Sequence, residues 1–189
     1  MQKRYAFCSL CLIPFLTLLL ASGFSWTGVN FSVIGSRGGR RLAFLVWGAL
    51  TGNYFYLHTR ELMELSGCRN RTLERLLFGA LVCFVTAVGI PYLPRQLPGL
   101  SRLHVGICFT STLLLAVVQV RFLRILQKKS GGGFGIQWSL LALLGTGVCI
   151  LLFSIGIIST LLEVYVTVGG CIYLWLLHCK LAGAAAKFV

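Results

Sequence analysis

Apolar stretches of about 20 residues, separated by short clusters of Lys and Arg, constrain the fold of this chain more than any other feature. A stretch of that length crosses the hydrocarbon core of a bilayer as an α-helix. Hydrophobic residues make up 57% of the 189-residue chain and charged residues only 11%, whereas an ordinary soluble domain has roughly 25% charged residues. The pattern excludes a water-soluble fold, and its apolar content excludes a disordered chain. It predicts an all-α, polytopic transmembrane helix bundle.

Hydropathy divides the chain into six expected spans within a single transmembrane domain of residues 1–189. The first apolar run is long for a signal peptide and further spans follow it, so we expect an uncleaved helix. A Pro-rich turn closes the third span, and a Gly-rich flexible loop follows the fourth. The break between the last two is short and predicts a tight helical hairpin. The expected spans are about residues 5–24, 42–58, 76–93, 101–123, 136–158 and 161–181.

The distribution of Lys and Arg between the loops predicts the orientation, because cytoplasmic loops carry the excess of positive charge. With the N-terminus inside, twelve of the 17 Lys and Arg residues face the cytoplasm and five face outward. We therefore expect a multi-pass protein of the cell membrane with both termini in the cytoplasm. The inner residues are Lys3, Arg4, Arg60, Arg69, Arg71, Arg75, Arg121, Arg124, Lys128, Lys129, Lys180 and Lys187, and the outer ones are Arg37, Arg40, Arg41, Arg95 and Arg102.

Several polar residues fall at the outer ends of the expected helices, where ionisable groups are costly and are functional candidates by default. A carboxylate and an imidazole there could form an acid/base pair or hold a polar headgroup. Guanidinium groups beside them suit a lipid phosphate, which they bind bidentately. The same residues could instead form a network that only stabilises the bundle. The candidate ligand-binding residues are Asn30, Ser32, Arg40, Arg41, His104 and Glu163.

No catalytic motif accompanies these residues, so enzymatic activity stays an open question. The Gly131–Gly133 run lacks the Lys-Ser/Thr of a nucleotide-binding loop, and the spacing of Cys8 and Cys11 lacks the context of a redox or metal site. We expect no cofactor and no metal. The formal net charge of +13 is spread between apolar segments, which predicts membrane lipids rather than nucleic acid as partners.

Gly48 and Gly52 form a GxxxG pattern in the second expected span. Such a pattern lets two helices approach closely. Packing within the bundle is its commoner use, and contact between subunits in a homo- or hetero-oligomer is the alternative.

Four short motifs give the chain a resemblance to a known superfamily. They are Asn30-Phe-Ser-Val-Ile-Gly35, Phe44 through Gly52, Gly89-Ile-Pro-Tyr-Leu-Pro94 with Leu103-His104, and Ile158-Ser-Thr-Leu-Leu-Glu163. With six spans, they resemble damage-regulated autophagy modulators, glycosylphosphatidylinositol-anchor lipid remodelling proteins and uncharacterised bacterial relatives. Most members have an acidic residue near the position of Ser32, where this chain has Val33 and Ile34. The resemblance implies a membrane role in lipid handling or membrane homeostasis, with no settled reaction.

The sequence is therefore consistent with three functions. The first is a lipid-associated membrane protein whose outer polar pocket binds a headgroup. The second is a structural or partner-binding membrane subunit in which the same residues stabilise the bundle. A small transporter is less favoured, because the polar groups gather at one face and the sequence has no internal repeat.

Overall fold

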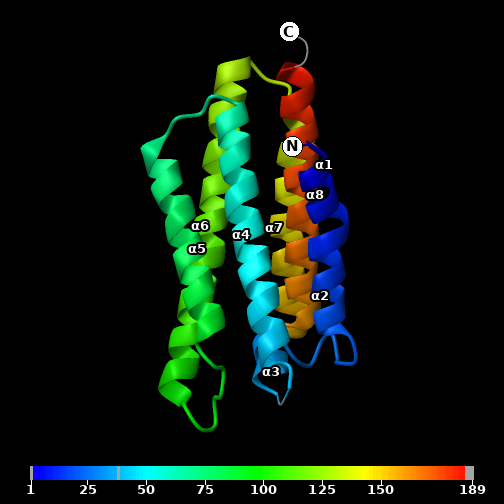
Figure 1. The fold of residues 1–189 in the computed structure, drawn as a ribbon, viewed down its shortest axis with the longest axis vertical. Coiled ribbons are helices and arrows are strands. Elements are labelled where there is room, and N and C mark those ends of the chain that lie inside the picture. The colour runs from blue at the N-terminus through cyan, green and yellow to red at the C-terminus, as the bar shows by residue number, and fades with distance from the viewer. Residues whose placement is uncertain (1, 38, 186–189) are drawn as a thin grey trace.

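The computed structural model describes residues 2–37 and 39–185, and all regular structure in those ranges is helical. The expected all-α fold is therefore confirmed. Long helical segments run alternately up and down in one bundle, and a short helix lies at one end of it (Figure 1). The elements are α1 (Gln2–Phe7), η1 (Cys8–Leu12), α2 (Ile13–Ala21), α3 (Phe31–Ser36), α4 (Arg41–Leu65), α5 (Arg71–Gly89), α6 (Pro98–Ser130), α7 (Gly135–Ile155) and α8 (Thr160–Ala185).

The two ends of the bundle differ in what they contain. The beginning of α1 and the end of α8 lie at one end, which we call the terminal end (Figure 1). The short helix α3 and the α5–α6 connection lie at the other, which we call the α3 end. Of the cytoplasmic residues expected from the sequence, Lys187 lies outside the described residues, as does the side chain of Lys3.

Five helices are long and apolar enough to cross a membrane, which identifies a membrane-embedded protein. They span Arg4–Ala21, Arg71–Gly89, Pro98–Ser130, Gly135–Ile155 and Thr160–Gly183. The helix α4, which contains the second expected span, is long enough to cross a membrane but is less apolar than these five helices. It packs against α2, α3, α5 and α8, and its buried residues include Thr51, His58 and Thr59. The part of its surface that packs against these helices accommodates polar side chains, while Leu42, Val46, Leu50 and Leu57 are exposed.

Several helices extend beyond the apolar runs from which we predicted them. The second expected span stops at residue 58, but α4 continues to Leu65. The fourth was expected over residues 101–123, but α6 runs from Pro98 to Ser130. Hydropathy detects only the membrane-buried part of a helix, whereas the backbone hydrogen-bond ladder continues into polar sequence.

Proline and glycine set most of the helix ends. The helix α5 ends at Gly89, and Ile90 is extended at φ −75° and ψ 125°, as expected for a residue before proline. Pro98 opens α6, where its missing N–H group has no helical partner to lose. Gly156 ends α7 in the left-handed conformation, at φ 76°. The predicted Pro-rich turn and the predicted α7–α8 hairpin are thus confirmed.

The first membrane helix contains a π-helical turn that hydropathy could not predict. This turn, η1, covers Cys8–Leu12 and is continuous with the α-helical segments on both sides. Pro14 follows it by two residues and cannot donate to the carbonyl of Leu10, which interrupts the α-helical ladder at this point. One residue of the turn, Ser9, is fully buried.

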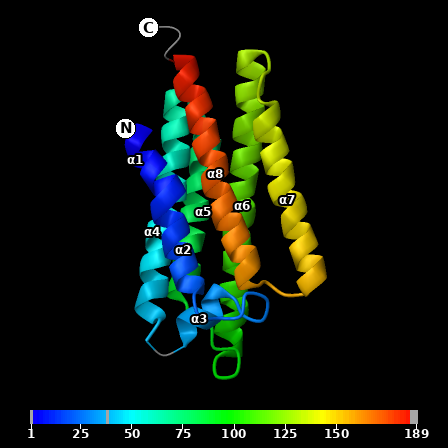
Figure 2. The same cartoon turned by 90° about the vertical axis from the view of Figure 1, so that its right-hand side faces the viewer.

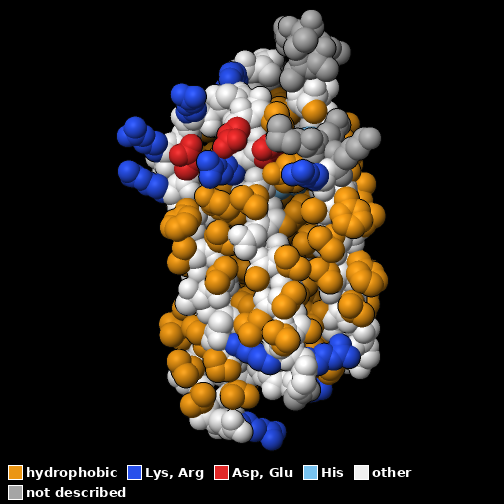
Figure 3. Space-filling view, in the orientation of Figure 1, with side chains coloured by type: hydrophobic (Ala, Val, Ile, Leu, Met, Phe, Trp, Pro, Cys, Tyr) orange, Lys and Arg blue, Asp and Glu red, His pale blue; other side chains and the backbone are white. Residues whose placement is uncertain are grey.

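The surface has the layered pattern of a membrane protein. Hydrophobic side chains cover the middle of the face in Figure 3, with charged side chains at its two ends. The most exposed helix is α7, of whose residues only Gln137 is buried, and Phe153 on it is 88% exposed. It packs along α8 and separates from α6 toward the α3 end (Figure 2). We infer that α7 faces lipid over most of its circumference.

The GxxxG pattern brings α4 close to α5 within the chain. A Cβ atom added to Gly48 would lie 2.6 Å from the side chain of Val88, and one added to Gly52 would lie 2.8 Å from Phe84. Both glycines therefore occupy an intramolecular contact, the use that the sequence pattern favoured. Oligomer formation stays a prediction.

We expect Gly48→Ala to lower the stability of the bundle by about 1–3 kcal/mol, because the new methyl group overlaps both methyl groups of Val88. Thermal unfolding in detergent measures this. Gly106→Ala on α6 is the control, since open space surrounds that position and alanine favours a helix over glycine. Equal stability of the Gly48 variant and the wild type would contradict the close α4–α5 contact.

Candidate functional site

The polar residues singled out in the sequence meet around α3, a helix that we did not predict. Asn30, Ser32 and their neighbours were expected in a loop, but residues 31–36 form α3. The side chain of Asn30 caps this helix by accepting a hydrogen bond from the N–H of Val33 at 2.9 Å. Asparagine is among the best residues for that position, so Asn30 has a structural task at the site.

Glu163 joins the start of α8 to the start of α3. Its Oε2 atom accepts a hydrogen bond from the backbone N–H of Phe31 at 2.6 Å. The preceding residues of α8 make backbone bonds to the same segment, from Thr160 N to Val29 O at 2.7 Å and from Leu161 N to Trp26 O at 2.8 Å. The non-helical segment before α3 thus provides acceptors for the first amides of α8, which a helix cannot satisfy internally.

His104 joins α6 to α3 and to the end of α5. Its Nδ1 atom lies 2.7 Å from the carbonyl oxygen of Ala87, which can only accept, so Nδ1 carries the proton. Its Nε2 atom lies 2.7 Å from the hydroxyl oxygen of Ser32 and, in a neutral ring, accepts from that hydroxyl. His104 and Ser32 are both buried, at 3% and 8% exposure.

The sequence left open whether His104 and Glu163 form an acid/base pair, and no hydrogen bond joins them among the described residues. Each binds a different residue of α3, His104 through Ser32 and Glu163 through Phe31. The structure therefore brings the two side chains to the same short helix but gives them separate partners.

Further hydrogen bonds tie α3 to the Pro-rich turn. The Ser36 hydroxyl donates to the Ser32 carbonyl at 2.8 Å and accepts from the N–H of Tyr92 at 3.2 Å. Ser101 on α6 accepts from the N–H of Leu93 at 3.0 Å. These bonds place the end of α5, the turn and the start of α6 against one side of α3.

Three arginines follow α3 at the corner that leads into α4. The guanidinium carbons of Arg37 and Arg40 lie 5.7 Å and 5.0 Å from the ring centroid of Phe24. Arg41 donates from Nη2 to the carbonyl of Gly89 at 2.6 Å. Its other terminal nitrogen, Nη1, is buried and has no hydrogen-bond partner among the described residues.

A second polar cluster lies inside the bundle near the terminal end, and we missed it in the sequence. The Ser9 hydroxyl is 2.7 Å from Tyr54 Oη, and Tyr54 Oη is 3.1 Å from His58 Nδ1. His58 Nε2 is 3.2 Å from His178 Nδ1, and Tyr5 stacks on the His58 ring. The sequence signal was present, because both histidines fall at the inner ends of expected spans, but depth alone does not show that two residues face each other.

Most of the cysteines are buried or half-buried, and Cys11 and Cys149 are exposed. All eight are free thiols, and Cys68, which lies between the second and third expected spans, is buried. Burial raises the pKa of the Cys68 thiol above its ordinary value, and the nearby Lys129 ammonium group lowers it by a smaller amount. A thiol in this state is a weak nucleophile at neutral pH.

Within residues 2–37 and 39–185, no group of three or more His, Cys, Asp or Glu side chains is placed to hold a metal ion. No family model, curated protein or solved structure matches the chain. The superfamily resemblance therefore stays a prediction that depends on its short motifs.

The bonding of His104 predicts the tautomer that is less common in free histidine. We expect nitrogen-15 NMR of the labelled protein to show a protonated Nδ1 and an unprotonated Nε2 for this ring, because Ala87 offers only an acceptor. In Ser32→Ala the Nε2 resonance should shift while the Nδ1 resonance stays in place. A protonated Nε2 in the wild type would contradict the hydrogen bonds described above.

The interior cluster predicts different effects for two buried tyrosines. Tyr54→Phe removes the hydroxyl that joins Ser9 and His58 and should destabilise the bundle by about 1–3 kcal/mol. Tyr173→Phe is the matched control, because the Tyr173 hydroxyl is buried without a partner among the described residues and its removal should be neutral or stabilising. Thermal unfolding in detergent compares the two variants. An equal loss of stability in both would contradict the hydrogen bonds described for this cluster.

Proposed function

We propose that this chain is a six-span, lipid-associated membrane protein whose α3 end binds the phosphate of a lipid headgroup. The proposal depends on the concentration of positive charge at the N-terminus of α4. There Arg37, Arg40 and Arg41 gather at a helix end whose first turn has no side-chain cap and no acidic residue.

A bound anion at the N-terminus of α4 would offset both the positive charge of the helix end and the mutual repulsion of the three guanidinium groups. A helix N-terminus carries partial positive charge and exposed amides, which favour a negative group. Instead, three guanidinium groups crowd this helix end, and the only ion pair among the described residues is Arg60 with Glu64 on a distant part of α4. Guanidinium groups bind phosphate bidentately, and the buried Nη1 of Arg41 is a donor without an acceptor.

The network around α3 positions this corner. Ser32 and Ser36 bind α6 and the Pro-rich turn, while Phe31 is held by Glu163. The helix that precedes the arginines is therefore held by hydrogen bonds, which reduces the ordering cost of binding. In this proposal Arg37, Arg40 and Arg41 contact the phosphate. Asn30, Ser32, His104 and Glu163 hold the start of α3 and its neighbours in place.

The topology proposed for the chain places that corner at the outer headgroup region. If α4 crosses alongside the five apolar helices, the number of spans is even and both termini lie on one side. The terminal end has an excess of positive charge, which is typical of the cytoplasmic side. Arg69 precedes α5, Arg71 begins it, and the last third of α6 contains Arg121, Arg124 and Lys128. We therefore propose that the α3 end faces outward from the cell membrane.

Native mass spectrometry of the protein released from detergent tests the binding proposal. We expect wild type to retain a phospholipid that the double variant Arg37→Gln, Arg40→Gln loses, with at least a fivefold fall in occupancy. The matched control is Arg95→Gln, Arg102→Gln, which removes two exposed charges from the same end of the bundle. Equal retention by all three proteins would contradict the proposal.

A stabilising network is the second candidate function, and the hydrogen bond between Glu163 and Phe31 favours it. Under this alternative the α3 end has no ligand, and the protein acts as a structural or partner-binding membrane subunit. Glu163→Gln distinguishes the two candidates in the same experiment. A lower melting temperature with no phospholipid bound to wild type would support the structural role alone.

A further inference from the structure

The last third of α6 lies at the headgroup level of the leaflet at the terminal end. Residues 103–120 of α6 contain no Lys, Arg, Asp or Glu, and at 1.5 Å per residue they are about 27 Å long. That length is close to the hydrocarbon thickness of roughly 30 Å. Arg102 and Arg121 therefore bracket the hydrocarbon, and Arg124 and Lys128 extend beyond it on the side of the terminal end.

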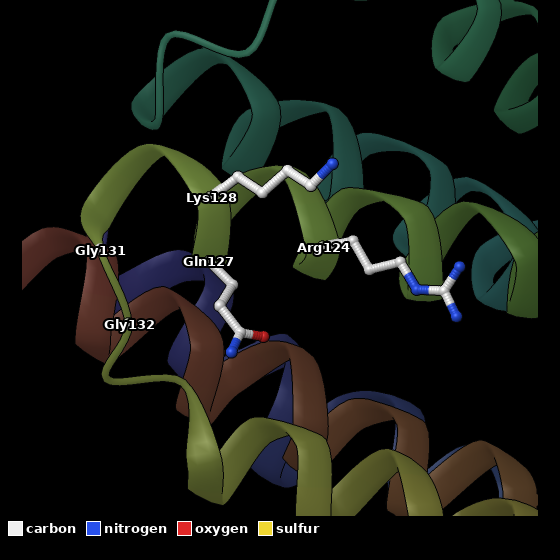
Figure 4. A pocket seen from close by; sticks show the side chains of 5 residues that line it. All are labelled: Arg124, Gln127, Lys128, Gly131 and Gly132. Carbon is white, nitrogen blue, oxygen red and sulfur yellow. The ribbon is translucent and has the colours of Figure 1, made fainter.

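Two adjoining depressions in the surface surround these cations. One, of about 450 Å³, is lined by Arg124, Gln127, Lys128, Gly131 and Gly132. In Figure 4 Arg124 and Lys128 extend from neighbouring turns of α6, while Gln127 is directed toward α7, where its oxygen accepts from the indole N–H of Trp138. The other, of about 320 Å³, lies between α6 and the start of α5 and shares Arg124 and Lys128. Both depressions are open to solvent, so they suit a headgroup that lies on the surface and not a ligand enclosed in a cavity.

The cations of these depressions have no acceptor, whereas three other cations at the terminal end have a partner. Arg60 pairs with Glu64, and Lys129 donates to the Ser66 carbonyl at 2.7 Å. Lys180 lies over the Phe134 ring at 4.6 Å. In contrast, no hydrogen bond or ion pair in the described part of the chain involves the three cations that line the depressions, which are Arg121, Arg124 and Lys128.

The α5 side of the second depression adds neutral donors and no carboxylate. Thr72 lines it, as does Asn70, whose side-chain oxygen caps α5 by accepting from Leu73 N at 3.1 Å. The first acidic residue of α5 is Glu74, which lines neither depression. The positive end of the α5 dipole points to the same place.

From this arrangement we infer that the paired depressions around Arg124 and Lys128 bind the headgroup of an anionic phospholipid from the leaflet at the terminal end. Three unpaired cations and no carboxylate favour a headgroup with net negative charge over a zwitterionic one. Basic clusters that directly follow a membrane helix are typical of anionic-lipid binding. This site lies at the opposite end of the bundle from the arginine corner of α4 and does not depend on it.

The test measures lipid affinity by native mass spectrometry of the full chain in detergent, titrated with phosphatidylglycerol or phosphatidylcholine. All proteins also carry Arg37→Gln and Arg40→Gln, which weakens binding at the α3 end equally in every protein compared. We expect phosphatidylglycerol to bind at least tenfold more tightly than phosphatidylcholine. Each cation near an anionic surface contributes roughly fivefold, so Arg124→Gln with Lys128→Gln should weaken phosphatidylglycerol binding about 30-fold.

A matched control separates a specific site from general attraction between charges. Arg69→Gln with Arg75→Gln removes the same charge from the same end of the bundle, and neither residue lines a depression. We expect this control to keep its affinity for phosphatidylglycerol within about threefold of its parent. Equal losses in the two double variants, or equal affinities for the two lipids, would overturn the proposal.

Two further measurements distinguish a lipid site from a free-anion site and from a purely stabilising role of the same cations. Inorganic phosphate at millimolar concentration should not displace the lipid, and displacement would show a site for free anions instead. The melting temperature of the Arg124, Lys128 variant should match that of its parent, because both side chains are exposed. A lower melting temperature with unchanged lipid affinity would show that these cations only stabilise the end of α6.

Discussion

Backbone amides and carbonyls near the hydrocarbon must find partners inside the protein, and the arrangement of the α3 end follows from that requirement. The segment that joins α2 to α3 is not helical, so its carbonyls have no helical donors. The carbonyls of Trp26 and Val29 accept from the first amides of α8, and Glu163 accepts from the first amide of α3. One set of bonds thus satisfies the start of two helices and the segment between α2 and α3.

The remaining polar contacts of that end depend on α3 being fixed in this way. Ser32 bonds to His104 and Ser36 bonds to Tyr92 from a helix whose first amide is bonded to Glu163 of α8. These contacts connect parts of the chain that are far apart in sequence. At the terminal end the chain of hydrogen bonds from Ser9 to His178 has the same effect, since it joins η1, α4 and α8. Fully bonded polar networks of this kind specify one arrangement of helices.

The sequence predicted the membrane class, the positions of the apolar helices and the turns at proline and glycine. Those features depend on local properties, which are mean hydropathy over about 20 residues and the conformational limits of two residue types. The depth of Asn30, Ser32, His104 and Glu163 was also predictable, and the structure places all four around α3. The residues to which these four side chains bond were not predictable, because depth in the membrane does not fix the direction in which a helix presents a side chain.

The same reasoning explains why α3, the contact of His58 with His178, and the depressions at the end of α6 were missed. Six residues of mixed polarity give no hydropathy signal, and the Asn30 cap is recognisable only once a helix is suspected. The two histidines are 120 positions apart. The α6 cations looked like a topology signal in the sequence, and only the folded chain shows which of them lack an acceptor.

The small burial of α7 has a consequence for how the sequence of this protein can change over generations. Because lipid surrounds most of this helix, selection acts there on overall hydropathy rather than on the shape of individual side chains. Gly147 is one of the exceptions, since a side chain at that position would overlap Tyr165. Related chains should therefore exchange Leu, Ile, Val and Phe freely along α7 while they keep a glycine where that tyrosine crosses it.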